Sequence, residues 1–332
     1  MSDDDRLTIA RYLGRDDIAA ALRSDARDGL TSRPKELPPK WFYDARGSEL
    51  FDEITRVAEY YPTEAERQAL YRSAEDIVGL SGADTVMELG SGSSDKTRVL
   101  LDAFDAAGSL RRYVPFDVSG TALESAARRL LDRYPSIAIS GVIGDFDRHL
   151  EHLPAGDARG GRGHRLLAFL GGTIGNYPPQ QRKQLLATMA EVLDQGETLL
   201  LGTDLVKEPT RIVSAYDDAS GVTAAFNRNV LAVLNRELGA DFDTDGFDHV
   251  ALWNASEEWI EMRLRARAAH TVRIPTLDLT VEFDAGEEIL TEVSAKFRRE
   301  RIVSELDAAG FELIGWFTDP AGDFALSLSR RV

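Results

Sequence analysis

Two glycines close a short apolar run near residue 90, and they carry the clearest chemical signal in the sequence. The run ends with Glu88-Leu89-Gly90-Ser91-Gly92. Glycines at the end of a buried strand let the backbone approach a ligand, and ligands bind at the carboxyl ends of such strands. The third glycine of a dinucleotide-binding turn is missing. The turn therefore indicates a ligand site, although an NAD site or plain tight packing would also produce it.

Two further apolar runs end in groups that suit an adenosine. Asp117 follows the second run, 27 positions beyond Gly90, and a carboxylate there can accept both ribose hydroxyls. Asp145 and Phe146 follow the third run, where the carboxylate can accept from the adenine amino group and the ring can stack. Each residue alone is explained more simply as a helix cap or a core aromatic. Together, the three run ends predict a site for an adenosine-bearing cofactor.

Other kinds of chemistry lack their signatures in this sequence. It has no cysteine, no G-x-x-x-x-G-K-[ST] phosphate loop and no G-x-S-x-G nucleophile turn. His149 and His152 are spaced for one helix face and His164 is nearby, so a metal site is conceivable. Their polar, loop-like surroundings favour solvated histidines. We therefore expect no metal.

The elements that must position these residues alternate between strands and helices. Such alternation is typical of a doubly wound parallel sheet with helices on both faces. Buried strands are predicted at Thr85–Leu89, Tyr113–Val118, Ile137–Ile143, Leu166–Leu170 and Thr198–Leu201. Helices are predicted at Asp95–Asp105, Ala122–Tyr134 and Gln180–Leu193, and the glycine-rich stretch Pro154–Gly163 is predicted as an exposed loop.

The segments that flank this core have different patterns. The N-terminal region is helical and aromatic, with helices predicted at Ile18–Gly29, at Ser48–Thr55 and from an N-cap at Thr63 to Val78. After Val206 the sequence predicts one long helix at Arg211–Leu238 and antiparallel strands at Val250–Trp253, Trp259–Thr271 and Leu277–Phe283. A last pair, Phe311–Phe317 and Phe324–Leu328, flanks a turn at Asp319–Gly322 and should complete the core sheet.

These patterns divide the chain into four segments. We expect a helical N-terminal region packed on the substrate site at 1–62 and a Rossmann-like core at 63–206. An inserted α+β substrate domain should follow at 207–285, and 286–332 should return to the core sheet. The predicted fold is therefore α/β, a doubly wound sheet with an inserted domain.

Composition limits the partners. The chain has 332 residues, of which 39 are basic and 56 acidic, for a net charge of −17. So acidic a surface repels phosphate backbones, which argues against nucleic acid and anionic membranes. Asp3, Asp4 and Asp5 stand where a signal peptide needs positive charge, and no apolar run approaches the roughly 20 residues of a membrane span. We expect a cytoplasmic, monomeric protein with a small-molecule substrate.

Longer motifs resemble a known family. The Glu88–Gly92 turn is similar to the first motif of class I methyltransferases. From residue 7 to the end, the chain resembles histidine-specific methyltransferases, most closely the actinobacterial ergothioneine-pathway type that trimethylates the α-nitrogen of L-histidine to hercynine. The motifs are Pro-Pro-Lys-Trp-Phe-Tyr-Asp, Gly-Ser-Glu-Leu-Phe-Asp and Glu-Tyr-Tyr-Pro-Thr within 35–63, Phe169–Asn176, Gly202–Leu205, Ala215–Asp218, Thr223–Asn227 and Glu292–Phe297.

The resemblance implies roles for particular residues. S-adenosylmethionine (SAM), which leaves as S-adenosylhomocysteine, would be bound by Gly90, Lys96, Asp117, Asp145 and Phe146, with Tyr43 close by. The amino and carboxylate end of the substrate would be held by Tyr60, Asn176 and Tyr216. Glu292 and Ser294 would hold the imidazole, with Met262 beside the ring. The family's Gly-Ser-Thr-Ile-Gly-Asn stands here with Gly171-Gly172, and Pro154–Gly163 is longer than usual, but neither departure touches a proposed contact.

The chemistry explains why such residues are needed. Methyl transfer to an amine disperses positive charge and builds no oxyanion, so positioning should supply most of the rate. A Glu292 carboxylate accepting from an imidazole N–H would reject apolar side chains by up to ~10⁴-fold. Tyr43 and Tyr60, the expected catalytic pair, could face a growing methylammonium with aromatic surface. The identity of a general base stays open.

Three rival functions remain. A methyltransferase of the same fold could act on tryptophan or another amino acid, although an indole has no use for two polar ring contacts. A non-catalytic adenosine-binding module is disfavoured by the full set of acceptor-holding residues. An NAD-dependent reductase is disfavoured by the missing third glycine.

Overall fold

The computed structural model describes residues 6–92, 94, 96–155 and 164–332. It separates into two compact units, which we describe one at a time. The core unit comprises Met1–Gly14, Glu64–Leu205 and Phe297–Val332, and the insertion unit comprises Arg15–Thr63 and Val206–Lys296. Both segments of the insertion unit interrupt the chain of the core unit. The predicted exposed loop at Pro154–Gly163 falls largely on 156–163, which lie outside the described residues.

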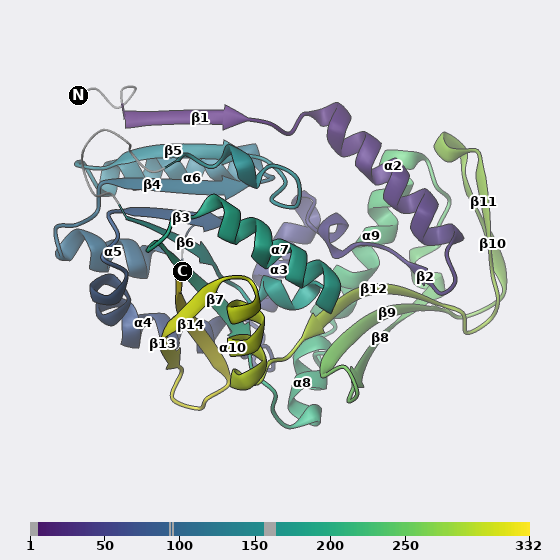
Figure 1. Ribbon diagram of the computed structural model, residues 1–332. Helices are drawn as coiled ribbons and strands as arrows, with labels where there is room; N and C mark the ends of the chain where they lie inside the picture. The colour runs from purple at the N-terminus through teal and green to yellow at the C-terminus, as the bar shows by residue number, and fades with distance from the viewer. Residues whose placement is uncertain (1–5, 93, 95, 156–163) are drawn as a thin grey trace. The chain divides into compact units, whose positions relative to one another are not determined.

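An eight-stranded sheet forms the centre of the core unit. Its strands are β1 (Leu7–Arg11), β3 (Thr85–Leu89), β4 (Arg112–Asp117), β5 (Ala138–Ile143), β6 (Arg165–Phe169), β7 (Thr198–Asp204), β13 (Phe311–Thr318) and β14 (Phe324–Arg331). They lie in the order β1-β5-β4-β3-β6-β7-β14-β13 (Figure 1). The first six are parallel, whereas β14 runs antiparallel to β7 and β13 antiparallel to β14. This is a doubly wound sheet, and the predicted C-terminal antiparallel pair completes one of its edges.

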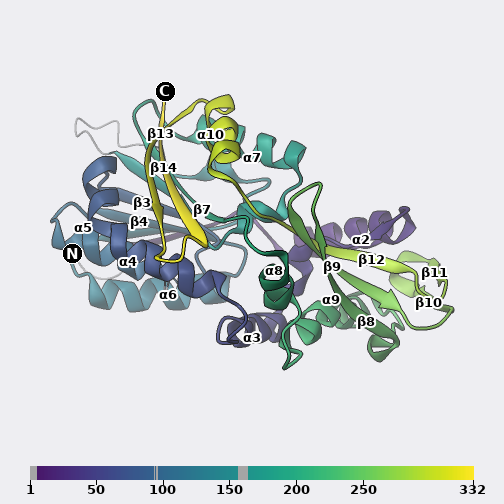
Figure 2. The same ribbon diagram turned by 90° about the horizontal axis from the view of Figure 1, so that it is seen from below.

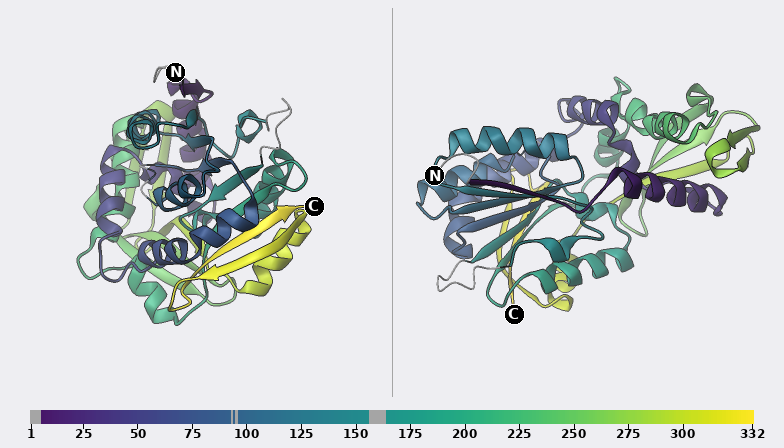
Figure 3. Two further views of the ribbon diagram at one scale, coloured as in Figure 1. Left: turned by 90° about the vertical axis from the view of Figure 1, so that its left-hand side faces the viewer. Right: turned by 90° about the horizontal axis from the view of Figure 1, so that it is seen from above.

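Helices cover both faces of this sheet. Their bounds are α4 (Pro62–Ser81), α5 (Arg98–Ala106), α6 (Gly120–Arg133), α7 (Pro179–Val192) and α10 (Arg299–Ala308). Helices α4, α5 and α6 bury their apolar side chains in one cluster with β3, β4 and β6. Helices α7 and α10 lie on the opposite face (Figures 2 and 3), where the buried Arg182 of α7 pairs with Glu305 of α10.

The predicted core elements are confirmed with shifts at their ends, and two predictions are wrong. Strand β3 has its predicted bounds, and the other parallel strands begin or end within three residues of theirs. Residues Leu7–Arg11 form a strand rather than part of a helical region, and they pair with β5 at the sheet edge (Figure 3). Thr63 lies inside α4 instead of capping it, because Pro62 occupies the first helical position, where a missing N–H costs nothing.

The insertion unit has its own sheet and core. Its four-stranded sheet has the order β2-β12-β9-β8, with β2 (Lys35–Glu36), β8 (Phe247–Asn254), β9 (Trp259–Ala266) and β12 (Glu288–Ala295). A hairpin, β10 (His270–Ile274) and β11 (Leu279–Phe283), stands apart from it. Apolar side chains of the helices and of β9 share one core. The helical elements are α2 (Arg15–Thr31), η1 (Pro39–Phe42), α3 (Ala45–Ile54), α8 (Pro209–Tyr216) and α9 (Val222–Leu238).

Three predictions for this unit need correction. The long helix at Arg211–Leu238 is two helices, because the Asp218 carboxylate accepts from the backbone N–H groups of Val222 and Thr223 and begins α9 anew. Burial of Asp218 opposes its ionisation, but these hydrogen bonds outweigh it and lower its pKa. The predicted strand at Trp259–Thr271 is divided between β9 and β10.

The third correction concerns the return to the core sheet, which was predicted to begin at residue 286. Strand β12 instead pairs antiparallel with β9 and parallel with β2, so it belongs to the insertion unit. The core unit resumes at Phe297. Among the helices of the described residues, none combines the length and the apolarity that a membrane crossing requires.

Candidate active site

The glycine turn after β3 has the geometry of a ligand-binding loop. Gly90 and Gly92 have φ angles of 69° and 49°, a region that glycine enters at little cost. A Cβ atom on either residue would meet nothing within 4 Å, so the turn faces open space. The N–H of Gly90 donates to Phe116 O of β4 at 2.8 Å, which ties the turn to the neighbouring strand end.

Asp117 organises the same loop from the end of β4. Its carboxylate accepts from the backbone N–H groups of Gly92 and Ser119, both at 2.8 Å. Burial raises the pKa of Asp117, and these hydrogen bonds partly oppose that rise. Because a carboxylate can accept more than two hydrogen bonds, the side chain keeps capacity for ribose hydroxyls.

Glu88, on β3 just before the glycine turn, stabilises the residues around that turn, a role that its sequence motif does not indicate. Its side chain is buried and accepts hydrogen bonds from Thr97 and from the hydroxyl of Tyr113. That hydroxyl also lies 3.0 Å from Ser94 Oγ, on the far side of the turn. Burial raises the pKa of Glu88 to about 7, against the lowering effect of its two hydrogen bonds and of Lys96.

Lys96 pairs with Glu66, a residue that the motifs of the sequence do not mark as part of the site. Its Nζ donates to Glu66 Oε2 of α4 at 2.5 Å, and Glu66 Oε1 accepts from the N–H of Gly171 at 2.5 Å. Glu66 is 1% exposed. The pair therefore joins α4, the glycine turn and the end of β6. An acidic residue on the helix before the turn was the only sequence signal for it.

Asp145, Phe146 and Asn176 follow the ends of β5 and β6. Asp145 Oδ1 accepts from the N–H of Asp147 at 3.0 Å, and the Phe146 ring meets Phe169 edge-on with centroids 5.5 Å apart. Asn176 ends the 3₁₀ turn η3 (Thr173–Asn176), half-buried. Since β5, β4, β3 and β6 are parallel neighbours, their carboxyl ends bring all these predicted residues to one edge of the core sheet.

The histidines near this edge have structural partners. His149 Nδ1 accepts from the backbone N–H of Asp145 at 3.1 Å. His152 stacks on Tyr12 with ring centroids 3.8 Å apart. Within the described parts of the chain, no cluster of three or more His, Asp or Glu side chains could hold a metal ion.

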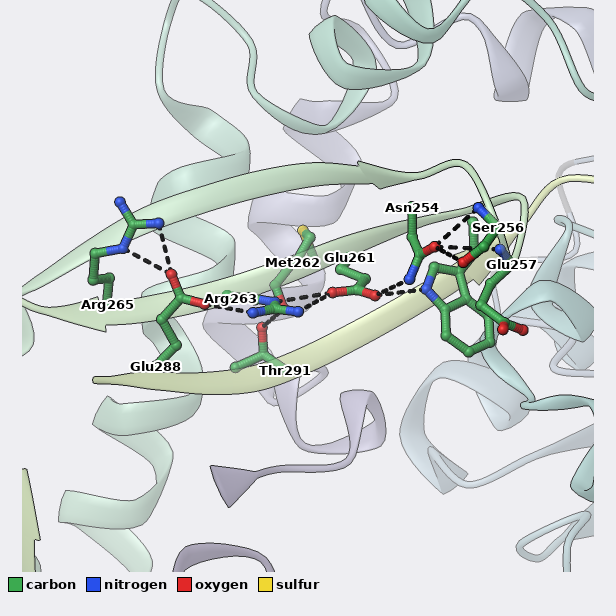
Figure 4. A network of polar contacts seen from close by, with 10 residues as sticks. Asn254, Ser256, Glu257, Glu261, Met262, Arg263, Arg265, Glu288 and Thr291 are labelled. Atoms are coloured by element: carbon green, nitrogen blue, oxygen red, sulfur yellow. Dashed lines mark hydrogen bonds and ion pairs between the residues drawn. The ribbon is translucent and has the colours of Figure 1, made fainter. Parts of the chain in front are cut away.

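In the insertion unit, a β-bulge determines which side chains of β12 face the core. The register with β9 shifts between Leu290 and Glu292, leaving Thr291 as the extra residue. Ile289 pairs with Leu264 before the shift, and Glu292 pairs with Met262 after it. A bulge residue reverses the alternation of a strand, so residues 292, 294 and 296 share the inner face with Met262. Figure 4 shows Thr291 beside Met262, with the ion pairs of Arg263 on the outer face.

Glu292 is a carboxylate without a partner inside its unit. It is 9% exposed, and across the described residues no hydrogen bond or ion pair to its side chain is formed. Burial raises its pKa to about 7, and the charge of Lys296 partly counteracts this. Such a group is costly to bury unless something supplies a donor. Met262, 2% exposed, lies directly across from it.

Ser294 and Tyr216 form a compact polar group with a buried lysine. The Tyr216 hydroxyl donates to Ser294 Oγ at 2.9 Å. Lys296 Nζ donates to both oxygens, each at 2.9 Å, and is fully buried. Lys296 belongs to the Glu292–Phe297 motif, and its i+2 spacing from Ser294 is the sequence signal for a shared strand face.

Tyr43 and Tyr60 belong to an aromatic cluster of the same unit. The Tyr60 ring meets Tyr216 edge-on at 6.2 Å between centroids, and Tyr43 meets Phe226 at 5.4 Å. Tyr43 is 44% exposed as a whole residue, although its hydroxyl is buried. Burial of that hydroxyl, together with the nearby Glu292 and Tyr216, raises its pKa. The structure thus brings together all six site residues predicted for this unit.

The order of the core sheet, with a glycine turn after β3 and aspartates at the ends of β4 and β5, is typical of class I methyltransferases that use SAM. More narrowly, the chain belongs to the family of histidine-specific, SAM-dependent methyltransferases, which it matches over residues 22–331.

Relatives of known function agree with this membership. The chain is 58% identical over 325 residues to the histidine N-alpha-methyltransferase of Mycolicibacterium smegmatis, covering 98% of this chain and 99% of the relative. It is 56% identical over 326 residues to that of Mycobacterium tuberculosis, covering 98% and 100%. It is also 28% identical to ergothioneine biosynthesis protein 1 of Schizosaccharomyces pombe, covering 87% of this chain and 38% of the relative.

Proposed function

We propose that this protein transfers three methyl groups, one at a time, from SAM to the α-amino group of L-histidine. The product would be hercynine, and the reaction the first step of ergothioneine biosynthesis. The observation that supports the substrate most directly is Glu292, a buried carboxylate that has no hydrogen-bond partner among the described residues. An imidazole N–H would supply the missing donor, while the side chain of leucine or phenylalanine would leave the charge unpaired.

The residues of the core unit suit the methyl donor, SAM. When bound, SAM supplies a methyl group on a positively charged sulfur. Asp117 keeps carboxylate capacity for the ribose, and Phe146 offers an aromatic face for the adenine. The glycine turn leaves open space beside the backbone, as a nucleoside requires. We assign Asp145 to the adenine amino group and Lys96 to holding the turn through Glu66.

The residues of the insertion unit suit the methyl acceptor, histidine. Glu292 and Ser294 would receive the imidazole on the inner face of β12, with Met262 packed beside the ring. Asn176 of the core unit has amide groups that suit the substrate's amino or carboxylate group. Tyr43 and Tyr60 would surround the nitrogen with aromatic surface, which accommodates a cation and tolerates each added methyl group.

A direct test of this function uses all possible amino-acid acceptors. The protein is incubated with SAM and each of the twenty amino acids separately, and the masses of the products are measured by mass spectrometry. We expect a gain of three methyl groups on histidine alone. Methylation of tryptophan in place of histidine, or no methylation, would overturn the proposal.

A matched pair of variants tests the role of Glu292. Glu292→Ala should weaken histidine binding by at least about tenfold while SAM affinity stays unchanged. Glu288→Ala is the control, because Glu288 lies on the same strand but pairs with Arg263 and Arg265 on the outer face (Figure 4). Equal losses of histidine affinity in the two variants would remove Glu292 from the site.

We further propose that the protein acts as a monomer in the cytoplasm, with histidine and its mono- and dimethylated forms as substrates and with no nucleic-acid or membrane partner. Light scattering during size-exclusion chromatography tests the monomer. A dimer mass at micromolar concentration would contradict it.

A further inference from the structure

Lys296 is a buried lysine whose ammonium group contacts two residues of the predicted imidazole site. Its ammonium group is fully buried and donates to Ser294 Oγ and to the hydroxyl of Tyr216, each at 2.9 Å. The Tyr216 hydroxyl in turn donates to Ser294 Oγ at 2.9 Å. These three groups form a closed triangle of hydrogen bonds, in which the direction of each bond can be worked out.

Lys296 must be the donor in both of its bonds, and the geometry of the third contact makes the Tyr216 hydroxyl the donor and Ser294 Oγ the acceptor. An ammonium has three donors and no acceptor, and a hydroxyl has one donor and two lone pairs. Ser294 Oγ receives one hydrogen bond from Lys296 and one from Tyr216, which occupies both of its lone pairs. The hydroxyl hydrogen of Ser294 then remains without a hydrogen-bond acceptor among the described residues. Ser294 can therefore meet a ligand only as a donor.

Glu292 has the opposite character. It lies two residues before Ser294 on the same face of β12, and when ionised it can only accept. The two side chains thus offer one acceptor and one donor to a ring between them. A neutral imidazole matches this pair, since one ring nitrogen carries a hydrogen and the other a lone pair. A histidinium ring has two N–H groups, and one of them would oppose the Ser294 hydrogen.

We propose that Lys296 is a positioning residue that fixes Ser294 as a hydrogen-bond donor and so makes the site select histidine with a neutral imidazole. The proposal rests on the proposed function, because it takes histidine as the ligand. Lys296 also places a positive charge near Glu292, which favours the ionised carboxylate needed as the acceptor. Among the described residues, the Tyr43 hydroxyl also interacts electrostatically with Glu292, and the same hydroxyl interacts with Tyr216.

The test measures histidine affinity against pH by isothermal titration calorimetry, with S-adenosylhomocysteine present. Below about pH 6.5, where free imidazole gains a proton, the wild-type affinity should fall at least about tenfold per pH unit. Ser294→Ala removes the opposing hydrogen, so Glu292 can bind histidinium. The slope of the logarithm of the association constant against pH should then decrease by about one unit.

Lys296→Met should decrease the slope in the same way and weaken histidine binding about tenfold at neutral pH, with affinity for S-adenosylhomocysteine unchanged. Arg265→Met is its control, because Arg265 is a cation on the outer face of neighbouring β9. If Lys296→Met does not fold, Ser294→Ala carries the test by itself, since it deletes a single oxygen and leaves the lysine bonded to Tyr216.

Nitrogen NMR of bound histidine, labelled in the ring, provides a second measurement. In the wild-type protein near pH 6, one ring nitrogen should carry a hydrogen and the other none, whereas both should carry one in Ser294→Ala. Two protonated nitrogens in the wild-type protein, or an unchanged slope in Ser294→Ala, would overturn the role of Lys296 while histidine remains the ligand. Failure of the wild-type protein to bind histidine at any pH would instead overturn the proposed function.

Discussion

Thr291 Oγ1 lies 2.7 Å from Asn227 Oδ1, at the bulge of β12. The same hydroxyl is 2.9 Å from Met262 O of β9. The Asn227 amide donates to His249 Nδ1 at 2.8 Å, and His249 Nε2 lies 2.8 Å from Tyr216 O. Burial lowers the pKa of His249, which suits a neutral ring that accepts at Nδ1 and donates from Nε2. A chain of polar contacts thus links the bulge to the end of α8.

Replacing Thr291 should disturb the imidazole side of the site alone. Thr291→Val keeps the shape of the side chain but leaves Asn227 Oδ1, which is buried, without its donor. We expect the KM for histidine to rise about tenfold, with little change in SAM affinity. Thr291→Ser keeps the hydroxyl and should behave like the wild-type protein. Steady-state kinetics with each substrate varied in turn will check this, and a rise in the KM for SAM alone would contradict it.

Separating the ion pair between the buried Glu66 and the half-buried Lys96 should destabilise the core unit. Lys96→Met leaves the Glu66 carboxylate buried with the Gly171 N–H as its remaining donor among the described residues, at an expected cost on the order of 2–3 kcal/mol. The double variant Glu66→Gln/Lys96→Met removes both charges and should recover part of that loss. Urea denaturation of both proteins measures the difference, and equal stabilities would contradict the expectation.

The same double variant separates two roles of Lys96. If Lys96 only holds the glycine turn through Glu66, affinity for SAM should recover together with stability. Recovered stability with SAM affinity still weak would instead show a direct contact between Lys96 and the cofactor. Calorimetric titration with SAM distinguishes these two results.

Glu88 should make the stability of the folded protein depend on pH. Its pKa in the folded state is about 7, above its ordinary value of 4.5, so folding favours the neutral form. The stabilisation is complete below pH 4.5 and is lost as the pH rises through 7, by at most about 3 kcal/mol. Glu88→Gln, which is neutral at every pH, should flatten this dependence.

Denaturation at about pH 5 and pH 8 measures the effect. Glu292, whose pKa is also raised to about 7, contributes with the same sign, so Glu292→Gln is needed as a companion variant. A Glu88→Gln profile as steep as that of the wild-type protein would show that folding does not raise the pKa of Glu88.

Tyr60 should matter most for the first methylation. Its half-buried ring lies beside Tyr216, and its hydroxyl can bond to an amine that still carries hydrogens. Tyr60→Phe should therefore weaken binding of unmethylated histidine more than binding of dimethylhistidine, which depends on the aromatic face. Calorimetry with both ligands measures the two affinities. Equal losses would exclude this role for the hydroxyl.

Much of the core unit follows from local patterns. A buried parallel strand is a short apolar run, and β3 has the predicted bounds because glycine and polar residues enclose that run. The edge strand β1 was missed, since its pattern is short and half-exposed and its pairing with β5 bridges more than 120 residues. Glu66 was missed for a similar reason, because nothing near it in sequence shows that Lys96 and Gly171 are its partners.

The sequence by itself determined the proposed SAM site. This site consists of a glycine turn, two aspartates and a phenylalanine, which all follow the carboxyl ends of parallel strands at one edge of the sheet. It also determined the residue types of the imidazole site. Only the tertiary structure decided how Glu292, Ser294 and Lys296 face Met262 and Tyr216, because one extra residue at Thr291 reverses the alternation of β12. A bulge depends on contacts across strands and with α9, and these are absent from any local pattern.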